Sequence, residues 1–271
     1  MKKIAFILIS AILFLGGCKK ENILSSNNND IKSTNMKMNY YGRILEYTVN
    51  YSPSTNKVTV EGKDAKEVEL ISLKYKNSVS LFETKNEVRF FNDKLDYYYY
   101  IFIQLSENND YYRLTKSKNN IIMSPTQSTD ITFYLNTYES VPLFTSNINT
   151  WNTPVQIFML RQPCNDGTNN SCPTYSVPRT GIKNPWVGSS SNDEISSLRV
   201  KNQYLVPDWG GHVTVTLFQD IDFGGKAIAF YFSAFSTTFN QNVDNLKDYK
   251  INTLLKNWND RTSSYECFYS F

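Results

Sequence analysis

The chain has 271 residues, of which 28 are Lys or Arg, 25 are Asp or Glu and one is His, giving a formal net charge of +3. This near balance, without a long basic run, argues against a nucleic-acid-binding protein. A single histidine excludes the H-E-x-x-H type of metal hydrolase, and no G-x-S-x-G elbow or phosphate loop is present. We therefore expect a protein that is not an enzyme. A glycosidase, which needs only two carboxylates, stays compatible with the sequence.

The N-terminal stretch has the composition of an export signal. Two lysines follow the initiator methionine, and an apolar run extends from Ile4 to Leu15, which is too short for a membrane span. The run ends in L-G-G-C at residues 15–18, which resembles the bacterial lipobox. The resemblance implies a signal peptide at 1–17 and acyl chains on Cys18 that hold the protein on a membrane. We expect a bacterial cell-envelope lipoprotein, at the outer membrane or cell surface rather than the inner membrane.

The next segment, 18–37, has the composition of a flexible tether. It is rich in Asn, Ser and Lys and poor in apolar residues, so it offers too little apolar surface to form a core. We expect this lipidated tether to let the folded part stand off the membrane.

Short strand-like runs fill the following segment, which we expect to be a separate domain at 38–147. Alternating apolar residues at 45–51 precede the turn sequence S-P-S-T-N and a return run at 58–60, which predicts a hairpin. Strands at this spacing predict a β-sandwich, of which the immunoglobulin-like sandwich is one arrangement. The further strand-like runs are Val68–Leu70, Val79–Leu81, Val88–Phe90, Tyr97–Leu105, Tyr111–Leu114 and Ile131–Leu135.

Four consecutive tyrosines, Tyr97–Tyr100, have two interpretations. An exposed row of rings is a platform on which a sugar can stack. In a strand, alternate rings would instead lie in the core and at the surface. We favour the strand, because alternate burial needs no ligand to explain it.

A polar stretch that ends in a proline, at 145–154, marks the boundary of a second domain at 153–271. In this domain Cys164 and Cys172 flank a short polar loop. An exported protein permits disulfides, and we expect these two cysteines to pair, although sequence alone does not fix the pairing. Cys267 would then be a free thiol packed in the core.

A strand and a tight hairpin are predicted at 213–225. The strand alternates apolar residues with threonine. Four residues then separate Phe218 from Phe223, and one residue separates Phe223 from Gly225. This spacing fits two aromatic rings packed over a turn and a glycine with positive φ. The lone histidine, His212, directly precedes the strand, and we interpret it as a strand-end residue rather than a catalytic base.

Two loops of the form N-D-x-x-S-S occupy 192–197 and 259–264. One such loop alone is typical of a solvated turn, because Asn, Asp and Ser side chains bond their own backbone. Two copies, each running into a strand and one preceded by the hairpin at 213–225, favour a shared role instead.

The hairpin and the loops together resemble the Greek-key motif and calcium loop of the βγ-crystallin family. The resemblance implies a double Greek-key sandwich over 153–271 that binds Ca²⁺ between the loop of one motif and the hairpin of the other. One site would combine the loop at 192–197 with the Gln219 carbonyl. The other would combine the loop at 259–264 with the region 161–166, where the hairpin pattern is missing. The implied ligands and loop supports are Asn192, Asp193, Glu194, Ser196, Gln219, Asn259, Asp260, Arg261 and Ser263.

The leading hypothesis is therefore an all-β, lipid-anchored protein whose C-terminal domain binds calcium. Few formal negative charges surround either site, so the affinity should be that of a sensor or an extracellular module. Two other hypotheses compete. One is an inhibitor of secreted proteases that presents the loop at 164–172, and the other is a carbohydrate- or surface-adhesion module that uses exposed tyrosines. The sequence leaves the protein or glycan partner open.

Overall fold

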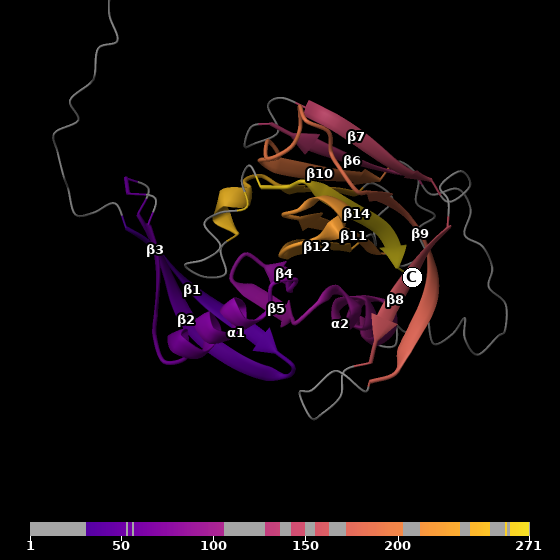
Figure 1. Ribbon diagram of the computed structural model, residues 1–271. Helices are drawn as coiled ribbons and strands as arrows, with labels where there is room; N and C mark the ends of the chain where they lie inside the picture. Colours follow the sequence, from indigo (N-terminus) through magenta and orange to yellow (C-terminus); the bar gives the residue numbers. More distant parts are fainter. Residues whose placement is uncertain are drawn as a thin grey trace, which may run out of the picture. The chain divides into compact units, whose positions relative to one another are not determined.

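The fold is described from a computed structural model of the chain (Figure 1). It describes residues 31–52, 54–55, 57–105, 128–135, 142–149, 155–162, 172–202, 212–233, 239–249, 258 and 261–270. Within these ranges strands dominate and two short α-helices are present. The all-β class predicted from the sequence is therefore confirmed at that level.

Two sheets account for the described strands (Figure 1). The larger has ten described strands in the order β3-β2-β1-β5-β4-β12-β11-β14-β9-β8. In this order they are Lys57–Glu61, Arg43–Ser52, Lys32–Tyr40, Glu87–Phe91, Val79–Thr84, Ala227–Ser233, His212–Phe218, Ser264–Ser270, Thr174–Asn184 and Val155–Arg161. The smaller has four described strands in the order β13-β10-β6-β7, which are Phe239–Val243, Ser197–Asn202, Ser128–Tyr134 and Pro142–Asn149.

Strands from both halves of the chain share these sheets. In the larger sheet β4 pairs in parallel with β12, with Leu81 opposite Ala229. In the smaller sheet β6 pairs with β10. Residues 31–271 thus form one compact unit, and the expected separation into domains at 38–147 and 153–271 is wrong. Alternation shows which face of a strand is apolar, but it does not identify the strand's neighbour.

The tether is also shorter than expected. The segment 18–37 was predicted to be flexible to its end, whereas β1 begins at Lys32 and pairs with β2 along its whole length. Met36 is buried within this strand. The polar residues around it occupy the exposed positions of a strand, which gave the segment a composition like that of a linker.

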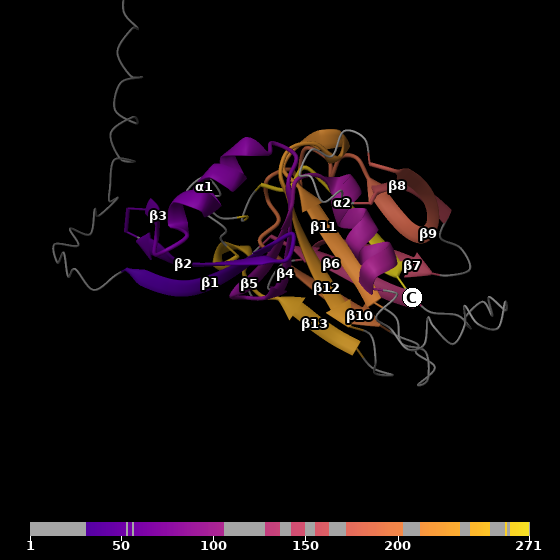
Figure 2. The same ribbon diagram turned by 90° about the horizontal axis from the view of Figure 1, so that it is seen from below.

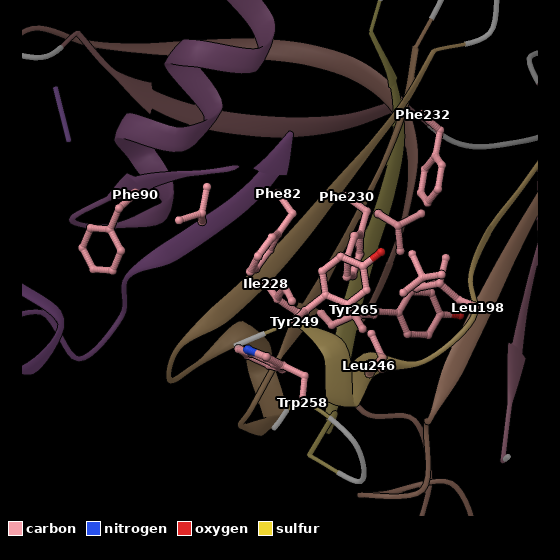
Figure 3. Close-up of a cluster of buried hydrophobic side chains, with 14 of the residues drawn as sticks. Phe82, Phe90, Leu198, Ile228, Phe230, Phe232, Leu246, Tyr249, Trp258 and Tyr265 are labelled. Carbon is pink, nitrogen blue, oxygen red and sulfur yellow. The ribbon is translucent and has the colours of Figure 1, made fainter. Parts of the chain in front are cut away.

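A shared hydrophobic core lies between the two sheets (Figure 3). Leu198 comes from β10 of the smaller sheet, while Ile228, Phe230 and Tyr265 come from β12 and β14 of the larger one. A 3₁₀ turn at Leu246–Asp248 adds Leu246 to the same core.

Two segments predicted as strands are helical. The run at 68–70 lies in α1 (Ala65–Lys74), and the run at 97–105 forms α2 (Lys94–Tyr99) and a π-helical turn (Tyr100–Gln104). Tyrosine favours strands, but the Asp93 side chain caps α2 by accepting from the Leu95 and Asp96 amides. This cap starts a helix before the tyrosines are reached. The run at 111–114 lies outside the described residues.

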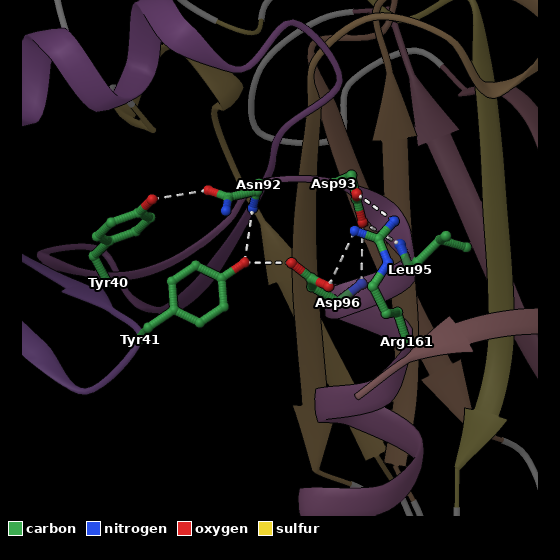
Figure 4. Close-up of polar contacts among 7 residues, drawn as sticks. All are labelled: Tyr40, Tyr41, Asn92, Asp93, Leu95, Asp96 and Arg161. Atoms are coloured by element: carbon green, nitrogen blue, oxygen red, sulfur yellow. Dashed lines mark hydrogen bonds and ion pairs between the residues drawn. The ribbon is translucent and has the colours of Figure 1, made fainter. Parts of the chain in front are cut away.

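The N-terminal end of α2 is fixed by charged and polar side chains from distant segments (Figure 4). Arg161, at the end of β8, lies 2.8 Å from Asp93 and 3.9 Å from Asp96. The Tyr41 hydroxyl, from the turn between β1 and β2, donates to the fully buried Asp96 carboxylate. This network ties the turn between β1 and β2, and the end of β8, to one helix end.

Candidate metal centre

The predicted hairpin at 213–225 is present. Strands β11 and β12 are antiparallel, with Phe218 opposite Ala227. The Phe218 and Phe223 rings pack edge to face, with centroids 5.6 Å apart. Gly225 has a φ of +69°, and a Cβ atom there would lie 2.6 Å from Asp220 Oδ2. The aromatic spacing and the glycine were thus correctly interpreted.

The second loop packs against this hairpin. The Ser263 N–H donates to the Phe218 carbonyl at 2.9 Å. The Ser264 hydroxyl donates to the Asp220 carbonyl at 2.6 Å and accepts from the Phe223 N–H at 3.1 Å. Ser264 is fully buried and is the first residue of β14. Its hydroxyl therefore joins the start of β14 to both sides of the turn.

The first loop lies beside the second. The Asp193 N–H donates to the Thr262 carbonyl at 3.2 Å, and the Val187 N–H donates to the Ser263 carbonyl at 3.0 Å. Asp193 has a φ of +58°, a left-handed conformation that Asp and Asn adopt more readily than other side chains. The structure therefore brings the two N-D-x-x-S-S loops together.

Two buried oxygens at this junction have no hydrogen-bond partner among the described residues. They are Asn192 Oδ1 in the first loop and Thr262 Oγ1 in the second. Thr262 is fully buried, and the Asn192 amide nitrogen donates to Asp193 Oδ2 at 3.0 Å. A buried polar atom without a partner costs about 1–3 kcal/mol, so a pair of them calls for an explanation.

The sequence-predicted ligands are only partly gathered here. Glu194 is exposed. Ser196 is buried, its N–H donates to the Tyr134 carbonyl and its own carbonyl accepts from the Leu246 N–H, both at 2.9 Å. Ser196 thus fixes the start of β10 to the smaller sheet. The Gln219 N–H donates to the Lys226 carbonyl at 3.0 Å and closes the hairpin.

The remaining predicted ligands belong to the second loop. Ser263 is buried and Arg261 is half-buried, while Asn259 and Asp260 lie outside the described residues. Sequence reasoning missed Thr262, which occupies a variable position of the loop pattern. No local sequence signal marks it, because its burial depends on the first loop lying beside it.

The atoms at the junction that could coordinate a metal ion are mostly neutral oxygens. In the described part of the chain no three His, Cys, Asp or Glu side chains gather closely enough to hold a metal ion by themselves. Amide, hydroxyl and carbonyl oxygens suit a hard cation such as calcium, which takes six to eight oxygens. They do not suit a thiophilic metal.

The cysteines and the histidine lie away from this junction. Cys172 is disulfide-bonded, and its expected partner, Cys164, lies outside the described residues. Cys267 is free and buried, as predicted, and burial raises the pKa of its thiol. His212 begins β11, stacks on Tyr231 at 4.2 Å and has its pKa lowered to about 4 by burial. Its imidazole is therefore neutral at pH 7.

Comparison with known proteins adds no further assignment. No protein family, curated protein or solved structure matches the chain. The likeness to βγ-crystallins therefore rests on the hairpin and loop motifs alone. Across the described ranges, no helix is both long and apolar enough to cross a membrane.

Proposed function

We propose that the chain is a calcium-binding lipoprotein of the bacterial cell envelope, with the ion held where the two N-D-x-x-S-S loops meet. The observation that carries this proposal is the pair of unpartnered buried oxygens, Asn192 Oδ1 and Thr262 Oγ1. They come from like loops that are far apart in sequence and joined by the Asp193–Thr262 hydrogen bond. A hard cation would satisfy both atoms at once.

The roles of the nearby residues follow from their chemistry. Asn192 and Thr262 would supply side-chain oxygens, and Asp193 the nearest carboxylate. By the resemblance, the carbonyls of Glu194 and Arg261 would add to the set. The guanidinium of Arg261 opposes the ion's charge unless it points into solvent. With so little negative charge, the affinity would be modest.

The membrane location is proposed from the lipobox-like sequence that ends at Cys18. The junction of the two loops would then face the envelope or the medium, where a modest calcium affinity is still useful. Replacing Cys18 by serine should abolish labelling with a radioactive fatty acid. Unchanged labelling of Cys18→Ser would remove this part of the proposal.

Thermal unfolding with and without calcium tests the ion. At a hundredfold excess over Kd, binding adds about 2.7 kcal/mol, which raises the Tm of a unit of this size by about 5–10 °C. Thr262→Val should abolish this rise without lowering the Tm in chelator, because the variant removes an unsatisfied hydroxyl.

Thr214→Val is the matched control. Thr214 is also fully buried with an unpartnered Oγ1 among the described residues, but it lies in β11. It should keep the calcium response. A wild-type protein that melts at one temperature in chelator and in millimolar calcium, with no binding heat, would show that the loops are ordinary turns.

A further inference from the structure

Two large apolar side chains are exposed beside the junction of the two loops. Trp186 follows the end of β9 and is 53% exposed, and Ile221 lies in the turn between β11 and β12 and is 55% exposed. The two strands that this turn joins run side by side (Figure 2). The Asp222 N–H donates to the Pro185 carbonyl at 2.9 Å. Each apolar side chain is thus one residue from a bond that joins the two turns, so the two belong to one end of the larger sheet.

The second N-D-x-x-S-S loop contacts both of these turns. The N–H of Val187, the residue after Trp186, donates to the Ser263 carbonyl at 3.0 Å. The Ser264 hydroxyl bonds the hairpin on either side of Ile221. Trp186 and Ile221 therefore flank the loops that form the proposed ion site.

The turn that carries Ile221 is held in place by its neighbours. Asp222 has a φ of +54° and Phe223 a φ of +59°, a left-handed conformation that bulky residues rarely adopt. The Phe223 ring packs on Phe218, and its N–H donates to the Ser264 hydroxyl at 3.1 Å. A rearrangement that buried Ile221 would break these contacts, so its exposure is built into the hairpin.

The charge at this end of the sheet is nearly balanced. Lys226 donates to the Ser72 carbonyl, Lys94 lies 5.6 Å from the centroid of the Phe223 ring, and Arg261 is half-buried. Four carboxylates against these three cations leave about one negative charge among the described residues, and a bound Ca²⁺ would turn it into about one positive charge. Calcium would therefore change repulsion from an anionic surface into attraction. The four exposed carboxylates belong to Asp193, Glu194, Asp220 and Asp222.

The proposed ion site also lacks a full set of ligands. Its protein oxygens would be the side chains of Asn192 and Thr262, the Asp193 carboxylate and two carbonyls. Calcium takes about six to eight oxygens, so about one to three positions would be filled from outside the protein. Phosphate oxygens are hard, anionic ligands that suit these positions.

We infer that this end of the sheet docks on a phospholipid bilayer when calcium is bound, with Trp186 and Ile221 inserted among the headgroups and lipid phosphates on the ion. The inference rests on the proposed calcium site. Tryptophan, which has an apolar body and one N–H donor, is enriched where membrane meets water. Two side chains on neighbouring turns enter a bilayer without matching its shape, whereas a stable protein partner needs about 800 Å² of complementary surface.

The proposed lipid anchor would keep this end within reach of a membrane. Residues 19–30 separate Cys18 from Ile31, and a chain of this length spans at most about 45 Å. The compact unit at 31–271 has an expected radius of gyration of about 18 Å, which corresponds to a diameter of about 45 Å. The anchored protein could therefore turn any face toward the bilayer.

Sedimentation with vesicles tests the inference on a chain of residues 19–271, which contains the whole compact unit but no lipidation site. The vesicles contain phosphatidylglycerol and phosphatidylcholine. The protein should sediment with them in millimolar calcium and stay in solution in chelator. Calorimetry of the same protein with calcium and without vesicles tests the ion site separately.

Variants separate insertion from ion binding. Trp186→Ser and Ile221→Ser should each weaken vesicle binding about tenfold, because each removes a large apolar side chain from the contact. Both should keep the heat of calcium binding. Met159→Ser is the matched control, because Met159 is 45% exposed on β8 but lies opposite Ser176, eight residues before the end of β9. It should sediment as the wild type does, and Thr262→Val should lose both signals.

Each other outcome is equally specific. A heat of calcium binding without sedimentation would overturn the inference and leave the ion site standing, whereas absence of that heat would remove the ion site itself. Equal sedimentation in calcium and in chelator would overturn the role of calcium. Unchanged sedimentation of both Trp186→Ser and Ile221→Ser would overturn insertion. Calcium-dependent dimers that form without vesicles and disappear in these two variants would assign the surface to a second copy of the chain instead.

Discussion

The Tyr98 hydroxyl donates a hydrogen bond to the Glu266 carboxylate, although 168 residues separate the two in sequence. Both side chains are buried, and Lys183 Nζ lies 3.8 Å from Glu266. Burial nevertheless raises the pKa of Glu266 above its usual value. Helix α2 is therefore bonded, through Tyr98, to a buried carboxyl group whose ionisation costs folding free energy.

This relationship predicts a specific pH dependence. A carboxyl with a raised pKa in the folded state stabilises the fold at low pH and loses that contribution as pH rises through the folded pKa. Glu266→Gln should remove this loss, so its free energy of unfolding relative to wild type should increase with pH. Tyr98→Phe, which leaves an acceptor unsatisfied, should destabilise by about 1–3 kcal/mol. Urea unfolding at several pH values measures both, and a Glu266→Gln difference that is flat with pH would contradict the argument.

The opposite sign is expected for His212. Burial lowers its pKa from 6.5 to about 4, so between these values the unfolded chain binds a proton that the folded chain does not. The free energy of unfolding should therefore decrease as pH falls from 6.5 toward 4. His212→Phe, which retains a ring against Tyr231, should reduce that decrease. Denaturation at pH 7, 5.5 and 4.5 would reveal it, and equal slopes for variant and wild type would exclude the effect.

Removal of Arg161 should be costly. It is only 15% exposed and neutralises Asp93 and the fully buried Asp96. Arg161→Met would leave two carboxylates uncompensated at the start of α2, at a cost of about 3–5 kcal/mol. Adding Asp96→Asn should recover part of this loss. If the double variant is no more stable than Arg161→Met, the ion pairs do not account for the effect.

Gly225 should tolerate alanine poorly. The left-handed conformation costs a non-glycine residue about 1–2 kcal/mol, and the new Cβ would also press on Asp220. Gly42 is the matched control, because its φ is +87° but nothing lies within 4 Å of an added Cβ. Gly225→Ala should therefore lower the Tm more than Gly42→Ala does. Equal losses would mean that the backbone conformation alone matters.

A fragment of residues 153–271 should not fold by itself. Strand β12 would lose β4, and β10 would lose β6, which exposes apolar core faces to water. We expect no cooperative thermal transition in this fragment, with or without calcium. Adding a fragment of residues 31–147 should restore one. A cooperative transition of the C-terminal fragment alone would support the two-domain organisation that the strand pairing argues against.

The sequence predicted the local geometry around Phe218, Phe223 and Gly225 correctly, because a tight hairpin is determined by residues close in the chain. It failed where distant contacts decide. Residues 97–100 are all tyrosine, so they show no alternation of apolar and polar residues that could tell a strand from a helix. The strand propensity of tyrosine favoured a strand, but the Asp93 side chain caps a helix there.

The candidate metal centre shows the same limit. Both N-D-x-x-S-S loops were recognisable in the sequence. Whether they lie side by side depends on the strands that follow them, because β10 belongs to the smaller sheet and β14 to the larger one. Thr262 gains its importance only from that arrangement. The hydrophobic pattern likewise could not show that β4 and β12 are neighbours, since many apolar strands would satisfy the same alternation.

The Cys267 thiol is open to oxidation at one stage only, before the larger sheet has formed. It lies in β14, between β11 and β9 in the larger sheet, with no exposed surface. If the chain lies in the cell envelope, as proposed, an oxidant there would reach the thiol before that sheet closes, and an incorrect pairing with Cys172 would then compete with folding. Once the sheet has closed, the thiol is out of reach. The rate at which an alkylating reagent modifies Cys267 thus reports how often the centre of the native sheet opens.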